Sequence, residues 1–340
     1  QGISSLKKRM PLIIAAAALL LFSGLFLFLY FYNDTLRFHH MTEEFFAEAF
    51  RQDSLSLHYT LAEPSDYLQK PSPATLPLYS RQSRQEAAAA LENQLLILQE
   101  INPERLNQQD RYTWSLLVPY LENELAGARC EYYEEPLTPS SGMQSQLPVL
   151  LAEYSFRTKE DLEDYLEILE SVPAYLESLA QYEKEKANAG LFMTKSDASN
   201  IVKQCDTIMD PDLLSAGEHF LQTTFQERAE ALVQEGLLTG EEMELYIAEN
   251  NRILTTLVAP AYIALADAVF LLSGSGTHEG GLCELPSGGA YYLYLLRHNT
   301  GTSRTPEEIQ VLLSDRFQLC YQNLQALVET YREQTGNTSI

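Results

Sequence analysis

Apolar residues recur at steps of three and four along most of the chain, which is the spacing of one face of an α-helix. The clearest run begins at Thr158, because Thr158 and Asp161 have the spacing of a capping box. Its apolar stripe continues to Val172, where Pro173 predicts a kink or a new start, and Gly190 is a suitable stop. The pattern therefore predicts a long, half-buried helix from Thr158 to about Gly190.

Other segments carry the same signature. Thr305, Pro306 and Glu308 give the strongest helix start in the chain. We expect helices at 41–51, 83–100, 108–128 and 211–235, and further helices that begin at Thr239, Pro260 and Thr305. The segment after Pro260 is apolar on most faces, so it is expected to be buried in the body. At about 12 residues it is too short to be a second membrane span.

Two stretches lack helical periodicity. Residues 131–148 hold three prolines and a Ser-Ser-Gly, and residues 273–290 hold six of the 16 glycines, which predicts loops with tight turns or close backbone approach. The aromatic segment from Ala290 to Tyr294 has the composition of a short strand. The expected fold class is therefore mainly α, a large multi-helix body with a glycine-rich loop and at most one short strand segment.

The longest run without a charged residue extends from Met10 to Tyr32, and Lys7, Lys8 and Arg9 precede it. A helix of this length spans roughly 34 Å, enough for a hydrocarbon core of about 30 Å. A basic cluster before the span predicts that the N-terminus stays in the cytoplasm and that the rest lies outside. The expected organisation is a cytoplasmic basic stub at 1–9, a transmembrane signal anchor in the lipid bilayer at 10–32, and an extracytoplasmic helical domain at 33–340.

A cleaved signal peptide is the alternative for the same residues. Its apolar region would be about 7–15 residues long and would end in small residues, whereas this run is longer and closes on the aromatic segment from Phe28 to Tyr32. No cysteine follows the run, so a lipid-anchored start is not expected. Because the chain begins with Gln1 and ends in a polar tail at Ile340, we also expect it to be truncated at both ends.

The charge balance is strongly acidic. The chain has 23 Lys and Arg against 47 Asp and Glu, a formal net charge of −24, and a hydrophobic content of 45% that is ample for a core. Such a balance repels the phosphate backbone, and no stripe of Lys and Arg compensates it. Nucleic acid is therefore excluded as a partner.

Known motifs of catalysis are not found in the glycine-rich stretch. A phosphate-binding loop needs a lysine after its glycines, and no lysine follows Lys203. His278 and Glu279 begin like a zincin helix, but the second histidine would fall at Leu282. The other histidines (39, 40, 58, 219 and 298) show no ligand pattern. The sequence itself therefore names no catalytic residue, metal ligand or cofactor.

The four cysteines are Cys130, Cys205, Cys283 and Cys320, and none forms a Cys-x-x-Cys pair. Outside the cytoplasm they could form disulfides with three possible connectivities. Cys320 lies on the apolar stripe of its helix, so buried thiols are the other interpretation. The sequence leaves both open.

Several segments resemble the bacterial domain-of-unknown-function family 885, over about residues 40–335. They are Tyr132-Tyr133-Glu134-Glu135-Pro136-Leu137-Thr138-Pro139, Gln146 to Tyr154, Thr158 to Leu166, Gly190-Leu191-Phe192-Met193, Ala259-Pro260-Ala261-Tyr262, Gly288-x-x-Tyr291-Tyr292 and Thr305-Pro306-Glu307-Glu308-Ile309. Complete members of that family resemble zincin-type zinc peptidases with a largely helical body around a cleft. Their His-Glu-x-x-His helix lies downstream of the Tyr-Tyr segment, so the resemblance implies zinc in a complete protein and no metal ligand in this chain.

The same resemblance implies that the segment from Gly288 to Tyr292 lines the peptide cleft, with Gly288, Gly289, Tyr291 and Tyr292 as candidate substrate-binding residues, because glycine permits close backbone approach. Arg297 and His298, which follow the tyrosines, are further candidates for substrate contact. A plain packed turn and strand is the alternative for this segment.

The resemblance favours a membrane-anchored, extracytoplasmic N-terminal part of a zincin-like metallopeptidase that acts on peptides and is inactive on its own. A non-catalytic helical module that binds a peptide, a wall component or a partner protein is the alternative.

Overall fold

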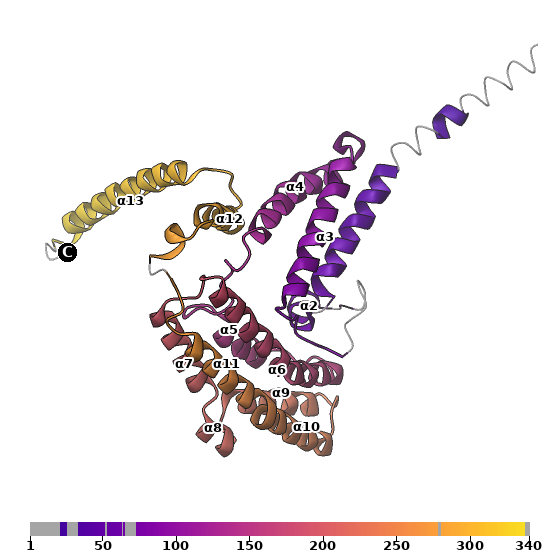
Figure 1. Cartoon of the computed structure of the whole chain (residues 1–340), viewed down its shortest axis with the longest axis vertical. Coiled ribbons are helices and arrows are strands. Elements are labelled where there is room, and N and C mark those ends of the chain that lie inside the picture. The colour runs from indigo at the N-terminus through magenta and orange to yellow at the C-terminus, as the bar shows by residue number, and fades with distance from the viewer. Residues whose placement is uncertain are drawn as a thin grey trace, which may run out of the picture. The chain divides into compact units, whose positions relative to one another are not determined.

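The computed structural model describes residues 21–25, 33–51, 53–62, 64, 73–277 and 280–336, and every regular element within them is a helix (Figure 1). The first described helices are at 21–25 and 33–50. The remaining α-helices are α2 (Ser54–Thr60), α3 (Arg81–Glu100), α4 (Gln108–Ala128), α5 (Met143–Glu153), α6 (Lys159–Asn188), α7 (Lys195–Ile208), α8 (Pro211–Ala216), α9 (Phe220–Gln234), α10 (Gly240–Ile253), α11 (Ala259–Leu272), α12 (Gly288–Thr300) and α13 (Pro306–Thr335). Short helical turns lie at η2 (Pro103–Arg105), η3 (Leu254–Val258) and η4 (Gly281–Glu284). The mainly helical class predicted from the sequence is confirmed.

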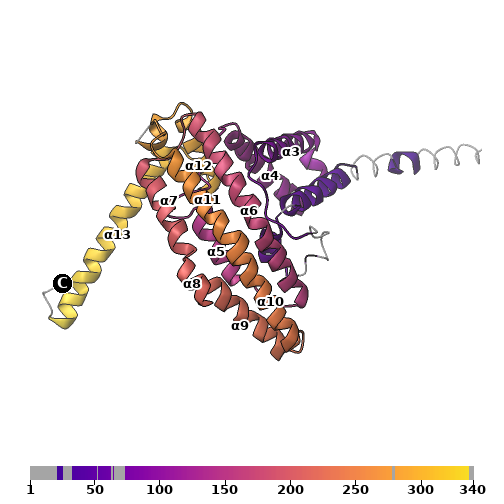
Figure 2. The same ribbon diagram turned by 60° about the horizontal axis from the view of Figure 1, so that its bottom comes forward.

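The chain divides into two compact units, residues 1–281 and residues 282–340. In the first unit, α6 packs against α11, α10 and η3, while α7 packs against α11 and α5 (Figures 1 and 2). The start of α6 is the predicted capping box, with the Thr158 hydroxyl accepting from the Asp161 N–H and the Asp161 carboxylate accepting from the Thr158 N–H. Its apolar stripe, including Leu162, Leu169 and Leu179, is fully buried in the main core.

An extended segment before α3 is held along α6 by hydrogen bonds from its backbone N–H groups to side chains of the helix. The N–H of Ala74 donates to the Glu167 carboxylate at 2.7 Å, and the N–H of Leu76 donates to the Ser171 hydroxyl at 3.1 Å. The N–H of Tyr79 donates to a third residue of the helix, Ser178, at 2.9 Å. Side chains of one helix therefore satisfy the backbone of a segment that has no sheet to join.

A second, smaller core joins α3, α4 and the helix at 33–50. Its members are Phe38, Met41, Leu98, Ile101, Leu106 and Leu121. The Trp114 indole N–H donates to the carbonyl of Leu98 at 3.0 Å, and Arg105 pairs with the buried Asp34 at 3.0 Å. Both contacts fix α4 and its preceding turn against the other two helices.

Two prolines that lie inside helices do not end them. Pro173 lies within α6, which continues to Asn188, so the predicted new start there is wrong. Buried residues on both sides of Pro173 offset the missing hydrogen bond. Pro148 lies within α5, which begins at Met143, so the second part of the predicted loop at 131–148 is helical.

The helices predicted to begin at Thr239 and Pro260 form one continuous helical run from Gly240 to Leu272. Between α10 and α11, η3 is a π-helical segment in which the N–H of Ala259 donates to the Leu254 carbonyl. This wider turn immediately precedes Pro260, which has no N–H to donate. The run is the one helix among the described residues that is long and apolar enough to cross a membrane by length and composition alone. Tyr262, Leu265 and Val269 are buried, and α11 packs on α6 and α7, whereas Phe270 and Leu271 are exposed, so the predicted burial of this segment is confirmed for one face only.

The single helix predicted at 211–235 is two helices. Gly217 adopts a left-handed conformation with φ of 75°, which ends α8, and His219 then caps α9 by accepting from the N–H of Leu221. The chain therefore turns between them, a change that the apolar stripe alone does not reveal.

The second unit contains α12 and α13. Residues 290–294, predicted as a short strand, lie inside α12, so that prediction is wrong. Aromatic residues three and four apart can share a helix face as readily as aromatic residues can line a strand. The predicted start of α13 at Thr305 is confirmed by its capping box with Glu308. Most of the predicted membrane span at 10–32, with the basic stub at 1–9, lies outside the described residues, so it stays a prediction.

Candidate functional site

All six residues predicted to contact a substrate lie in α12. Gly288 is buried, and a Cβ atom on it would meet the carbonyl oxygen of Leu282 at 1.5 Å. The close approach that glycine permits at this position is therefore to the backbone of η4 in the same unit. Gly289 has open space around its Cα, so a second backbone could approach there.

The two adjacent tyrosines of α12 differ in exposure. Tyr291 is buried and its ring centroid lies 5.4 Å from that of Tyr294, whose ring in turn lies 5.5 Å from His298. Tyr292 is exposed and shares a helix face with Gly289, three residues earlier. Arg297 and His298 fall in the last turn of α12. The structure thus brings Tyr291 and His298 into one column and leaves Gly289 and Tyr292 on another face.

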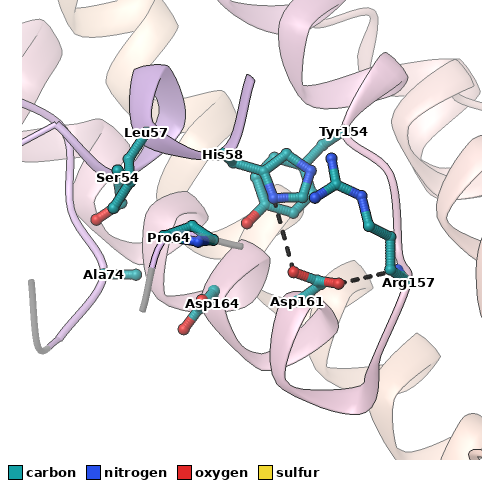
Figure 3. Close-up of a pocket in the computed structure, with 9 residues that line it drawn as sticks. All are labelled: Ser54, Leu57, His58, Pro64, Ala74, Tyr154, Arg157, Asp161 and Asp164. Carbon is teal, nitrogen blue, oxygen red and sulfur yellow. Dashed lines mark hydrogen bonds and ion pairs between the residues drawn. The ribbon is translucent and has the colours of Figure 1, made fainter. Parts of the chain in front are cut away.

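A second cluster surrounds His58 of α2, at the N-terminal end of α6 (Figure 3). The His58 ring is buried and stacks on the ring of Tyr154, with centroids 3.6 Å apart and planes 14° apart. Its Nε2 lies 3.2 Å from the Ser155 hydroxyl, and its Nδ1 lies 3.7 Å from an Asp161 carboxylate oxygen. The sequence gives no local signal for this cluster, because α2 and the start of α6 are far apart along the chain.

The cluster contains the residue types of the Ser-His-Asp catalytic triad, as Ser155, His58 and Asp161. The geometry of these three residues nevertheless limits what they can do. The 3.7 Å separation is too long for a hydrogen bond. The other oxygen of the same carboxylate accepts from the N–H groups of Arg157 and Thr158, so Asp161 is committed to the helix cap. The enclosed space is about 20 Å³, which fits about one water. As far as the described residues enclose it, the cluster fastens α2 to α6 and leaves no room for a substrate.

A buried group of charges lies near the other end of α6. The Lys186 ammonium is almost fully buried and contacts the Glu135 carboxylate at 2.6 Å and the carbonyl of Glu134 at 3.1 Å. Glu183 is also completely buried, and neither of its carboxylate oxygens has a hydrogen-bond partner. The pKa of Glu183 is raised to about 7, chiefly by burial; this net value includes a lowering by the nearby Lys186 and a further increase caused by Glu135. Glu183 can therefore hold a proton near neutral pH.

No group of three or more ligating side chains that could hold a metal ion occurs within the described ranges. The residues present there do not fit a zinc site. His278 and Glu279, which start the incomplete zincin pattern, lie outside those ranges. Cys130, Cys205, Cys283 and Cys320 are present as thiols, so the structure holds no disulfide among them. Cys205 is buried as expected of a core thiol, whereas Cys320 of α13 is exposed.

The fold is shared with a solved protein. The crystal structure of a candidate lipoprotein from Colwellia psychrerythraea matches with a TM-score of 0.71 at 16% sequence identity. The match covers 88% of this chain and 51% of the other, so this chain spans about half the length of that neighbour. No curated protein matches the chain.

Family membership follows from a separate match. Residues 67–339 match the family described as "Bacterial protein of unknown function (DUF885)". This range includes α3 to α13 and confirms the resemblance found in the sequence. The chain belongs to the DUF885 family.

Proposed function

We propose that this chain forms the N-terminal helical part of a longer, zinc-dependent peptidase that acts outside the cytoplasm and is anchored in the membrane by residues 10–32. The resemblance of complete DUF885 proteins to zincins supports the peptidase activity. The length of the structural neighbour, about twice the matched part, supports a longer protein. Its description as a candidate lipoprotein supports a location at or outside the membrane.

The apolar face of α13 is the observation that carries the central part of this proposal, that the chain packs against a further part of a longer protein. Its residues alternate at steps of four and three, the spacing of a helix face that packs on other helices, namely Leu313, Phe317, Cys320, Leu324, Leu327 and Tyr331. No residue of α13 is buried, and Phe317 is 71% exposed. An exposed apolar stripe along a 30-residue helix is a surface for another part of a folded protein. We assign that surface to a C-terminal part of the same protein.

In this proposal the described residues of the chain form part of the wall of the peptide cleft, and they do not fit a zinc site. The exposed face of α12 with Gly289 and Tyr292 is the part offered to a peptide. The rings of Tyr291, Tyr294 and His298 contact one another along a different face of the same helix. Gly289 and Tyr292 therefore bind or position a peptide in this proposal, and the groups that break the peptide bond lie in another part of the longer protein.

Expression of the complete gene product beside residues 1–340 tests the proposal. We expect the complete product to hold zinc by elemental analysis and to hydrolyse unstructured peptides, while residues 1–340 do neither. A Phe317→Glu change should destabilise the complete product and leave residues 1–340 almost unaffected. A complete product without zinc would contradict the proposal and favour a non-catalytic binding module. Peptide hydrolysis by residues 1–340 alone would also contradict it.

A further inference from the structure

A long groove runs between the helix at 33–50 and α3, and it widens where α4 and the segment before α3 reach it. Two adjoining hollows of about 480 and 560 Å³ form the groove and share Glu48, Ala90 and Gln94. Ala87 and Ala90 belong to a run of four alanines in α3, and their small side chains leave this space open. The groove therefore has room for several side chains of a ligand.

The wider end of the groove has an aromatic wall. Phe45, Tyr79 and Tyr120 line it, and the rings of Phe45 and Tyr120 meet edge to face with centroids 6.2 Å apart. Tyr120 is 46% exposed, although its ring partner Phe45 packs against the second core. This wall offers apolar area that the described residues do not cover.

The groove is also negatively charged. Its two hollows are lined by the acids Glu44, Glu48, Asp53, Glu86, Glu124 and Glu134 and by the arginines Arg37, Arg51 and Arg84. Each arginine already has partners. Arg37 pairs with Glu100 and Arg51 with Glu48, while Arg84 lies over the ring of Tyr182 at 4.4 Å and 3.6 Å from Glu185.

Tyr120 lies beside one of these carboxylates. Burial and the carboxylate of Glu124 together raise the pKa of Tyr120, burial being the larger cause. A negative groove in a chain of net charge −24 repels anionic lipid head groups and nucleic acids. It attracts a ligand that is both cationic and apolar.

We propose that this groove binds a cationic peptide segment with apolar side chains. Its amines face Glu86, Glu124 and Glu134, and its apolar side chains pack against Phe45, Tyr79 and Tyr120. Charge complementarity selects the peptide and the aromatic wall retains it. The inference is independent of the proposed peptidase function, because every residue it uses lies in the described part of this chain and no zinc is involved.

Binding can be measured with the whole chain in nanodiscs of phosphatidylcholine, by fluorescence anisotropy of a short labelled peptide of lysine and leucine. Empty discs correct for binding to lipid. We expect saturable binding that weakens with added salt, and no comparable binding of the same peptide with glutamate in place of lysine. Equal binding of the acidic peptide would overturn the proposal.

Two variants locate the site. Ala90→Trp fills the groove and should weaken binding by about tenfold or more, whereas Ala89→Trp, on the neighbouring exposed position outside the lining, should not. Circular dichroism and thermal melting check that both variants fold. Unchanged binding by a folded Ala90→Trp variant would overturn the proposal.

A double variant in the acidic residues of the groove keeps the test decisive if Ala90→Trp fails to fold. Replacing both Glu86 and Glu124 with Gln should weaken binding by about three- to tenfold at low salt. The matched control replaces Glu92 and Glu122, which are exposed on the same two helices and lie outside the lining. Equal effects of the two pairs would show a general charge effect and would overturn the assignment to the groove. Peptide binding in the groove does not depend on zinc, so failure of this inference is distinguishable from failure of the peptidase proposal, which is judged by the zinc content and peptide hydrolysis of the complete product.

Discussion

Two helices of the chain, α6 and α13, are alike in sequence and opposite in environment. Each has 30 residues, begins with a threonine capping box and carries a continuous apolar stripe. In the first unit, α6 buries thirteen of its residues. In the second unit, α13 buries none. Local signals are therefore sufficient to form both helices, and only the partners available to each decide whether its apolar stripe becomes a core.

The comparison assigns different sources of stability to the two units. The first unit has a continuous core in which each large apolar side chain contributes about 1.5–3 kcal/mol by burial. The second unit has η4 and the ring contacts of α12, but α13 gains little from its own apolar residues. Substitutions in α6 should therefore affect folding far more than equivalent substitutions in α13.

The largest expected effect comes from removing a core side chain of α6. Leu169 is fully buried, so Leu169→Ala should lower the free energy of unfolding of the first unit by about 2–5 kcal/mol. The matched change is Leu324→Ala in α13, where the side chain is 58% exposed, and it should cost no more than about 0.5 kcal/mol. Denaturant unfolding followed by circular dichroism measures both. Similar losses for the two variants would show that α13 has a partner within this chain.

The next effect concerns the buried charge of α6. Because folding raises the pKa of Glu183, the folded chain holds this proton more tightly than the unfolded chain. Its contribution to stability is therefore complete below about pH 4.5 and is lost as the pH rises through about 7. A shift of this size corresponds to about 3 kcal/mol. At pH 8 the Glu183→Gln variant should be more stable than the parent by up to this amount.

The difference between the pH profiles of Glu183→Gln and the parent isolates this group from others that titrate. The matched control is Glu329→Gln, on the exposed surface of α13, which should leave the profile unchanged. Parallel profiles for Glu183→Gln and the parent between pH 4.5 and 8 would contradict the assignment of Glu183 as the titrating group.

Much of the helical content could be predicted because its signals are local. The starts at Thr158, Thr239 and Thr305 are confirmed as capping boxes, each of which needs two residues three apart. The predicted strand at 290–294 is wrong. A run of aromatic residues fits the period of a helix as well as that of a strand, and only the turn that precedes the run decides which of the two forms. The π segment before Pro260 was missed, because a proline at that position usually marks a new helix.

The clusters of polar residues could not be predicted because their members come from distant segments. His58 and Asp161 meet only because the segment before α3 lies along α6. Likewise, Lys186 forms an ion pair with Glu135, which lies in a loop whose conformation cannot be predicted from a periodic sequence pattern. One helix, α12, contains all the predicted substrate residues, namely Gly288, Gly289, Tyr291, Tyr292, Arg297 and His298. Their division between two faces of α12 could not be predicted, because residues 290–294 were expected to form a strand.

The smallest expected effect tests whether η4 and α12 of the second unit make a fixed contact with each other. A Gly288→Ala change places a Cβ against the Leu282 carbonyl, so η4 and the start of α12 must separate, at a cost of about 1–3 kcal/mol. At Gly289 the same change meets open space and should stabilise α12 slightly, by up to about 1 kcal/mol. Hydrogen exchange of α12 amides should therefore become faster in Gly288→Ala and unchanged or slower in Gly289→Ala. Equal exchange in both variants would mean that η4 does not hold α12, and that the second unit, unlike the first, has no fixed contact between its elements.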